Sequence, residues 1–103
     1  MLIQVNAGDI ELSDALDAHV REQVGSALRH VADRVTRVEV HLHDDNSSKS
    51  AADDKRCVME ARIGGQPPLA VDQASDDLYK SIGMAADKLG RAVSHKLEKL
   101  AAK

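Results

Sequence analysis

The stretch ELSDALDAHVREQVGSALRHVADRVTRVEVHLH, residues 11–43, changes the spacing of its apolar side chains once, after residue 34. In residues 11–34 they recur every three or four positions, which is typical of one buried face of a helix. In residues 35–43 they recur at every second position, which is typical of a strand with one covered and one wet face. The apolar positions are Leu12, Leu16, Val20, Val24, Ala27, Leu28 and Val31, followed by Val38, Val40 and Leu42. The stretch therefore predicts a helix that leads into a strand.

Polar residues near the start of this stretch predict where the helix begins. Ser13 is a suitable N-cap, because its hydroxyl can accept a hydrogen bond from a free backbone N–H of the first turn. Asp14 and Asp17 follow in that turn, where the helix dipole favours negative charge. Gly25 lies in the interior of the helix and costs about 1 kcal/mol relative to alanine. We expect the helix to begin after Ser13 and to tolerate the glycine.

Three more strands are predicted outside this stretch. LIQVN at 2–6, KRCVMEARI at 55–63 and LAVDQ at 69–73 alternate as strands do. The polar and charged stretch at about 44–54 predicts a flexible connection. GGQPP at 64–68 predicts a turn, because glycine supplies a positive φ and proline ends a strand ladder.

A second helix is predicted at the end of the chain. Ser75 is the N-cap that we expect for it, with Asp76 and Asp77 in the first turn. Its apolar stripe is Leu78, Ile82, Ala85, Ala86, Leu89, Val93, Leu97 and Leu100. The element order is therefore β-α-β-β-β-α.

This order predicts an α+β fold with two layers in a single domain, residues 1–103. A right-handed β-α-β crossover makes the first two strands parallel, and the hairpins that follow are antiparallel. The result is a four-stranded mixed sheet, and both amphipathic helices are expected to cover the same face of it.

Composition excludes several classes of function. Tyr79 is the one aromatic residue among 103, so the chain has no aromatic platform on which RNA bases could stack. Cys57 is the one cysteine, which excludes an internal disulfide, and its apolar register predicts burial rather than nucleophilic reactivity. There is no signal-peptide pattern and no apolar run of about 20 residues. We therefore expect a cytoplasmic protein.

Charge is distributed unevenly along the chain. Residues 80–103 contain six Lys or Arg against two acids, whereas the first 79 residues contain eight against 15. At about 100° per residue, several of the cations share one line along the last helix. These are Lys88, Arg91, Lys99 and Lys103, with His95 on the same line and Lys80 and Lys96 at the edges. Such a row matches a phosphate track, although cations are also favoured in the last turns of any helix by its dipole.

Two motifs resemble one known family. DLYKSIGMAADKLGR, at 77–91, resembles the helix signature of the ribosome hibernation-promoting factors, also labelled sigma-54 modulation proteins or ribosome-associated inhibitors. IELSDAL, at 10–16, resembles the entry to that family's first helix. The matching residues of the first motif are Asp77, Tyr79, Ile82, Asp87, Lys88, Leu89 and Arg91. The resemblance covers almost the whole chain, includes the order of elements, and is to the short form of the family.

The resemblance implies a binding protein and not an enzyme, with no catalytic residues and no cofactor. Family members occupy the decoding region of the small ribosomal subunit, contact rRNA and block tRNA and mRNA, in stationary phase or stress. The implied partner is thus the small subunit and its rRNA, with no membrane and no small-molecule substrate. The role in rRNA contact carries over to Lys88 and Arg91 and extends to His95 and Lys99. Outlying support is expected from Lys80, Lys96, Arg21 and Arg29.

Two other functions stay open. The first helix has Gln23 and Ser26 where family members commonly carry lysines. A module of the same fold that has lost rRNA affinity would instead bind a protein through the acidic loop and the open sheet face.

His41 and His43, followed by Asp44 and Asp45, have the spacing to share a zinc or nickel ion. No third ligand is fixed by the sequence, so we interpret them as polar alternation on a wet strand face and expect no metal. We also expect a structural role for Tyr79.

Overall fold

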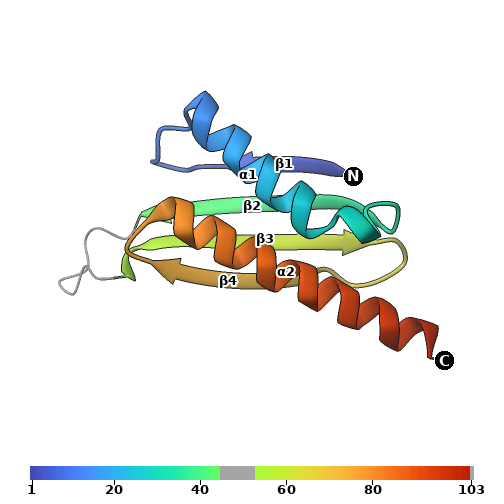
Figure 1. Cartoon of the computed structure of the whole chain (residues 1–103). Coiled ribbons are helices and arrows are strands. Elements are labelled where there is room, and N and C mark those ends of the chain that lie inside the picture. The colour runs from blue at the N-terminus through green and yellow to red at the C-terminus, as the bar shows by residue number, and fades with distance from the viewer. Residues whose placement is uncertain (45–52, 103) are drawn as a thin grey trace.

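The computed structural model describes residues 1–44 and 53–102, and Figure 1 shows a sheet with two helices on it. The elements are β1 (Leu2–Asn6), α1 (Asp14–Ala27), the 3-10 turn η1 (Arg29–Val31), β2 (Val35–Asp44), β3 (Lys55–Ile63), β4 (Leu69–Ser75) and α2 (Leu78–Ala101). The predicted α+β order is confirmed. The predicted connection at 44–54 begins with the last residue of β2, and its residues 45–52 lie outside the described part of the chain.

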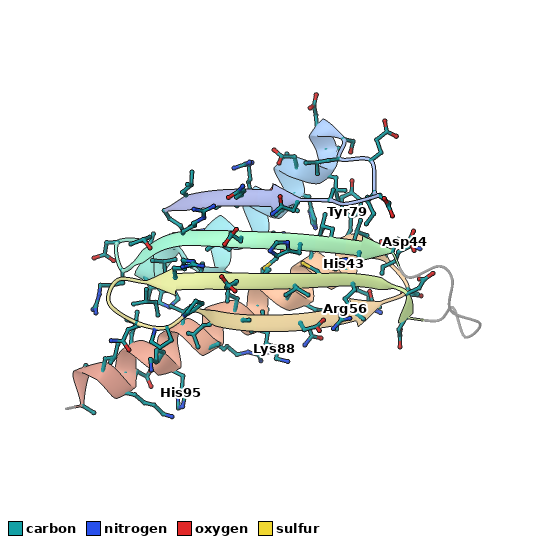
Figure 2. The ribbon with its side chains drawn as sticks, turned by 180° about the vertical axis from the view of Figure 1, so that it is seen from behind. His43, Asp44, Arg56, Tyr79, Lys88 and His95 are labelled. Atoms are coloured by element: carbon teal, nitrogen blue, oxygen red, sulfur yellow. The ribbon has the colours of Figure 1, made fainter. Side chains whose placement is uncertain are left out.

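The sheet has the order β1-β2-β3-β4. β1 is parallel to β2, and the other two pairs are antiparallel, as the crossover rule predicts. Both helices lie on one face of the sheet, α1 toward β1 and β2 and α2 toward β3 and β4 (Figure 1). The other face is open to solvent (Figure 2).

Alternation in β2 and β3 supplies the centre of the core. Val40 of β2 lies opposite Met59 of β3, which lies opposite Val71 of β4, and all three are buried. The helices add Leu16, Val20 and Val24 from α1 and Ile82, Ala85, Ala86, Leu89 and Val93 from α2. Each fully buried Val, Leu, Ile or Met contributes about 1.5–3 kcal/mol. The core contains no aromatic ring, because Tyr79 is exposed.

The first helix ends earlier than predicted. The pattern indicated a helix up to about residue 34, but α1 ends at Ala27 and η1 follows. A 3-10 turn has three residues per turn, so Leu28 and Val31 lie on the same side and both reach the core before β2 begins. Leu12, which was counted in the buried stripe, precedes the Ser13 cap and is exposed. Ser13 itself caps α1 as predicted, accepting from the N–H of Leu16 at 3.1 Å.

The predicted cap of the second helix is wrong. Asp77 is the N-cap of α2 and accepts the N–H of Tyr79 at 3.1 Å, whereas Ser75 is the last residue of β4. The Ser75 hydroxyl is buried 2.6 Å from that of Ser81, and it accepts the N–H of Asp77 at 3.2 Å. Ser81 in turn donates to the carbonyl of Lys55 at 2.7 Å. The two serines therefore join the start of α2 to β3 and β4.

A close contact between the helices depends on one glycine. A Cβ atom at Gly90 would lie 2.8 Å from the carbonyl oxygen of Ala27, which is backbone and cannot move aside cheaply. At Gly83, in the same helix, the nearest atom to a Cβ would be Oε1 of Gln23, at an ordinary 3.5 Å. The helices thus approach each other closely where the last turn of α1 meets α2 at Gly90.

We expect Gly90→Ala to lower the free energy of unfolding by about 1–3 kcal/mol, because the new methyl group must push the two helices apart. Gly83→Ala is the matched control and should raise it by about 0.5–1 kcal/mol, since alanine is the better helix former. Urea unfolding followed by circular dichroism measures both. Equal effects of the two substitutions would show that the helices do not touch at Gly90.

Candidate nucleic-acid interface

Four of the residues predicted to contact rRNA, three cations and His95, lie along the solvent side of α2. Lys88, Arg91, His95 and Lys99 are all exposed. At about 100° per residue, Arg91 points away from the sheet, and the other three fall within about 40° of one another on the flank that overhangs β4. Figure 2 shows Lys88 and His95 projecting on that flank. We call these four side chains the α2 row.

The other predicted cations lie apart from the α2 row. Lys80 is exposed near the start of α2, and Lys96 is half-buried closer to the sheet. Arg21 lies on α1 and donates to Asp17 at 2.9 Å and to the carbonyl of Ile3 in β1 at 3.0 Å. Because β1 and β4 are opposite edges of the sheet, Arg21 is at the far side of the molecule from the overhanging flank. Arg29 is exposed in η1 at the end of α1, and Lys103 lies outside the described residues.

The two acids of α2 lie on the flank that faces α1. Asp87 and Glu98 line a shallow groove of about 450 Å³ between the end of α1 and α2, together with Arg91 and His95. Asp87 also forms an ion pair with Arg91 at 3.4 Å, with both side chains more than 70% exposed. An ion pair so exposed contributes little, and it leaves Arg91 able to exchange partners. The groove therefore carries both signs of charge. On the flank above β4, residues 78–101 place Lys88 and Lys99 but no acidic side chain.

The groove also contains a hydrogen bond between helices. Nε2 of His30 in η1 lies 2.8 Å from Oγ of Ser94 in α2. At the other end of the helix pair, the ring of His19 packs against Tyr79 with centroids 4.7 Å apart, and its Nε2 lies 3.3 Å from the Tyr79 carbonyl oxygen. Tyr79 therefore bridges α1 and α2, in agreement with the structural role expected for it.

A polar cluster at the corner of β4 was not predicted. Nε of Arg56 in β3 donates to both carboxylate oxygens of Asp72 in β4, at 2.9 and 3.0 Å, and Nη2 donates to one of them. This hydrogen bonding holds the pKa of Asp72 below its usual value of 3.8, and the charges of Lys88 and His43 lower that pKa further. Alternation predicts that Arg56 lies on the wet face, but its pairing with Asp72 depends on strand register, which the pattern of either strand alone does not determine.

The open sheet face also contains the candidate metal ligands. His41 and His43 lie on that face of β2, and Asp45 lies outside the described residues. Within residues 1–44 and 53–102, no group of three or more His, Cys, Asp or Glu side chains is placed to hold a metal ion. No helix in the same residues is long and apolar enough to cross a membrane.

Comparisons with known proteins agree on one family. The family model described as sigma 54 modulation protein / S30EA ribosomal protein matches residues 3–101. A ribosome hibernation promotion factor from Picosynechococcus sp. is 23% identical over 99 residues, which are 96% of this chain and 50% of the relative. The chain thus spans about half the length of that curated relative.

Two solved structures have a similar fold. The N-terminal domain of Protein Y from Thermus thermophilus superposes with a TM-score of 0.72 and 23% identity, covering 92% of this chain and 98% of that one. A ribosomal subunit interface protein from Coxiella burnetii superposes with a TM-score of 0.67 and 23% identity, with both chains fully covered.

The cysteine is buried in the core, and this burial raises the pKa of the Cys57 thiol to about 12, with a further contribution from the charge of Asp72. We expect the native thiol to react with a disulfide reagent at pH 8 at least about 100-fold more slowly than the thiol of the urea-unfolded chain, because reaction requires opening of the fold. Absorbance of the released thiolate measures both rates. Similar rates in the two states would contradict the burial.

The same shift has a consequence for stability. The thiol of the unfolded chain ionises near its ordinary pKa of 9.0, before that of the folded chain. Stability from the neutral thiol is therefore fully present below pH 9 and is lost as the pH rises toward 12. Cys57→Ala should remove the part of the decrease in the free energy of unfolding between pH 9 and 12 that comes from ionisation of the thiol. The pH dependence of the urea midpoint measures this change.

Proposed function

Since this chain belongs to the sigma 54 modulation protein / S30EA ribosomal protein family, we propose that it is a ribosome hibernation factor. In this proposal it binds the small ribosomal subunit in the decoding region and contacts rRNA phosphates through the α2 row. The bound domain then excludes tRNA and mRNA by occupying their space. It acts by binding and not by catalysis.

The observation that carries the proposal is the position of the α2 row. Lys88 and Arg91 belong to the motif that resembles the family, and His95 and Lys99 continue the row along the same helix. From Lys88 to Lys99 the helix advances about 16 Å, at 1.5 Å per residue. Cations spread over this distance on a rigid helix can contact several phosphates at once, without an ordering cost for the backbone.

Charge favours a local interface over general attraction to nucleic acid. The chain has a net charge of −3, so it gains little from non-specific phosphate neutralisation. Binding then depends on presenting the α2 row to RNA while the acidic remainder faces elsewhere. The extents of the molecule, 47 × 27 × 19 Å, give it enough volume to block a channel by its presence alone.

The names of similar proteins support this proposal. One relative is called a ribosome hibernation promotion factor, and one solved neighbour is called a ribosomal subunit interface protein. Both names place those proteins on the ribosome. The cytoplasm, where ribosomes are, is the corresponding location for this chain.

We expect Lys88→Glu/Arg91→Glu to weaken binding to small ribosomal subunits by about 3–6 kcal/mol if each side chain makes one charge-assisted hydrogen bond. The slope of log K against log salt should also fall by about two, one unit for each lost phosphate contact. Co-sedimentation with purified subunits across a salt series measures both quantities.

Two controls accompany this test. Lys88→Glu alone is compared with Arg62→Glu, which makes the same change of charge at an exposed position near the end of β3, on the open sheet face and away from the α2 row. The second variant should bind nearly as wild type does. Full binding by the double variant would show that the α2 row is merely solvated. Absence of wild-type binding at low salt would reject the ribosomal role and direct the search to a protein partner.

A further inference from the structure

The corner where α2 overhangs β4 brings together side chains from four elements. His43 of β2 lies opposite Arg56 of β3, and Asp72 lies on β4 next to them. Lys88 approaches from α2 and is close enough to Asp72 for its charge to act on that carboxylate. Figure 2 shows His43 and Arg56 on the open face and Lys88 just beyond the edge of β4. We call this set the β4 corner.

The balance of charges varies over the open face. Lys55 lies between two carboxylates, Asp44 at 2.8 Å and Asp54 at 3.3 Å. Likewise, Arg62 lies between Glu60 at 3.4 Å and Glu39 at 4.0 Å. Around Lys55 and Arg62 two acids surround one cation, and Glu39 is shared with Arg37 at 3.6 Å.

At Asp72 the ratio is reversed, because three basic side chains act on one carboxylate. The guanidinium of Arg56 faces both of its oxygens, which is the fork geometry in which arginine also binds a phosphate. Asp72 thus occupies the place that the two non-bridging oxygens of a phosphodiester would take. Its bond also holds Arg56 in the orientation needed for that ligand.

The exchange of Asp72 for a phosphate is easy. The side chains of Arg56 and Asp72 are 46% and 43% exposed, so water can replace either partner and the pair contributes little to stability. A phosphodiester of RNA carries one negative charge, as the Asp72 carboxylate does, but it is not fixed to β4 and can take a position between Arg56, Lys88 and His43. Contacts with all three neighbours together would favour it over Asp72.

Lys88 connects this cluster to the α2 row, to which it also belongs. The positive surface of the helix therefore continues around the edge of β4 and onto the open sheet face. This continuity identifies the class of ligand, since a ribonucleotide strand bound along α2 would bring its next phosphates to this edge.

We propose that Arg56, Lys88 and His43 form a second RNA phosphate site at the β4 corner, and that Asp72 is the carboxylate which the phosphate displaces. This inference rests on the proposed function and extends it to the sheet face, which the sequence motifs do not mark. Asp72 limits affinity and holds Arg56 in place until RNA arrives.

The test compares variants for binding to purified small ribosomal subunits by co-sedimentation in a salt series. Asp72→Asn removes the competing charge and should tighten binding about 3- to 10-fold at low salt. Asp9→Asn is the matched control, because it makes the same chemical change at an exposed position in the turn after β1, at the opposite edge of the sheet. It should change binding less than twofold.

Arg56 is tested with two substitutions. Arg56→Gln should weaken binding about tenfold and lower the salt slope by about one, because one phosphate contact is lost. Arg56→Lys keeps the charge and loses the fork, so it should keep the salt slope and lose part of the affinity. Circular dichroism and the urea midpoint confirm that each variant is folded before binding is measured.

The outcomes separate this inference from the proposed function. If Lys88→Glu/Arg91→Glu abolishes binding while Asp72→Asn matches Asp9→Asn and Arg56→Gln binds as wild type does, the α2 row is the whole interface and the inference is overturned. Weaker binding by Asp72→Asn would also overturn it, by making that carboxylate part of the bound state. If the wild-type chain binds no subunits at any salt, the proposed function fails and the second phosphate site fails with it.

Discussion

The structure depends on the pairing of β2 with β3, two strands whose buried side chains all fall on the face toward the helices, while Val58 lies on the open face. Their register places Val38 opposite Ala61, Val40 opposite Met59 and Leu42 opposite Cys57, so nine residues of ladder produce one continuous apolar surface. That surface must be covered, and both amphipathic helices lie on it. Because no aromatic ring fills the layer between them, the helices pack close to the sheet and to each other, down to the contact of Gly90 with Ala27. The direction of α2, and with it the orientation of every cation on its outer side, follows from this packing.

The sequence predicted the fold almost completely, because nearly every element has a strong period of its own. Residues 37–44 and 55–63 alternate without a break, although the register of β2 shifts between Val35 and Arg37. The helices α1 and α2 have regular apolar stripes. The errors occurred where tertiary contacts override local signals. Ser75 has the composition of an N-cap, but its hydroxyl is used in a buried hydrogen bond to Ser81, and Asp77 caps the helix instead. Similarly, Leu28 and Val31 continue a helical pattern and are buried, yet a 3-10 turn delivers them to the core more directly.

The candidate site was predictable in part. Residues that share one helix, such as Lys88, Arg91, His95 and Lys99, can be grouped from the helical period alone. Arg21 and Arg29 could not be placed relative to them, because the position of α1 beside α2 is decided by the sheet. Arg56 and Asp72 are 16 residues apart and meet through strand register, which is a property of the pairing and not of either strand. The open face was therefore the part of the surface about which the sequence said least.

The separation of charge between α2 and the remainder of the chain also bears on how the protein would meet a partner. A molecule whose negative and positive charges are concentrated at different places has a permanent dipole moment, and the field of a polyanion exerts a torque on it. Rotation in that field occurs within the encounter complex, before any contact forms, and raises the fraction of collisions that arrive in the productive orientation. A uniformly basic protein of the same size would collide as often but with no preferred face. A net negative charge is in this sense compatible with fast association, because the repelled side of the molecule turns away as the attracted side approaches.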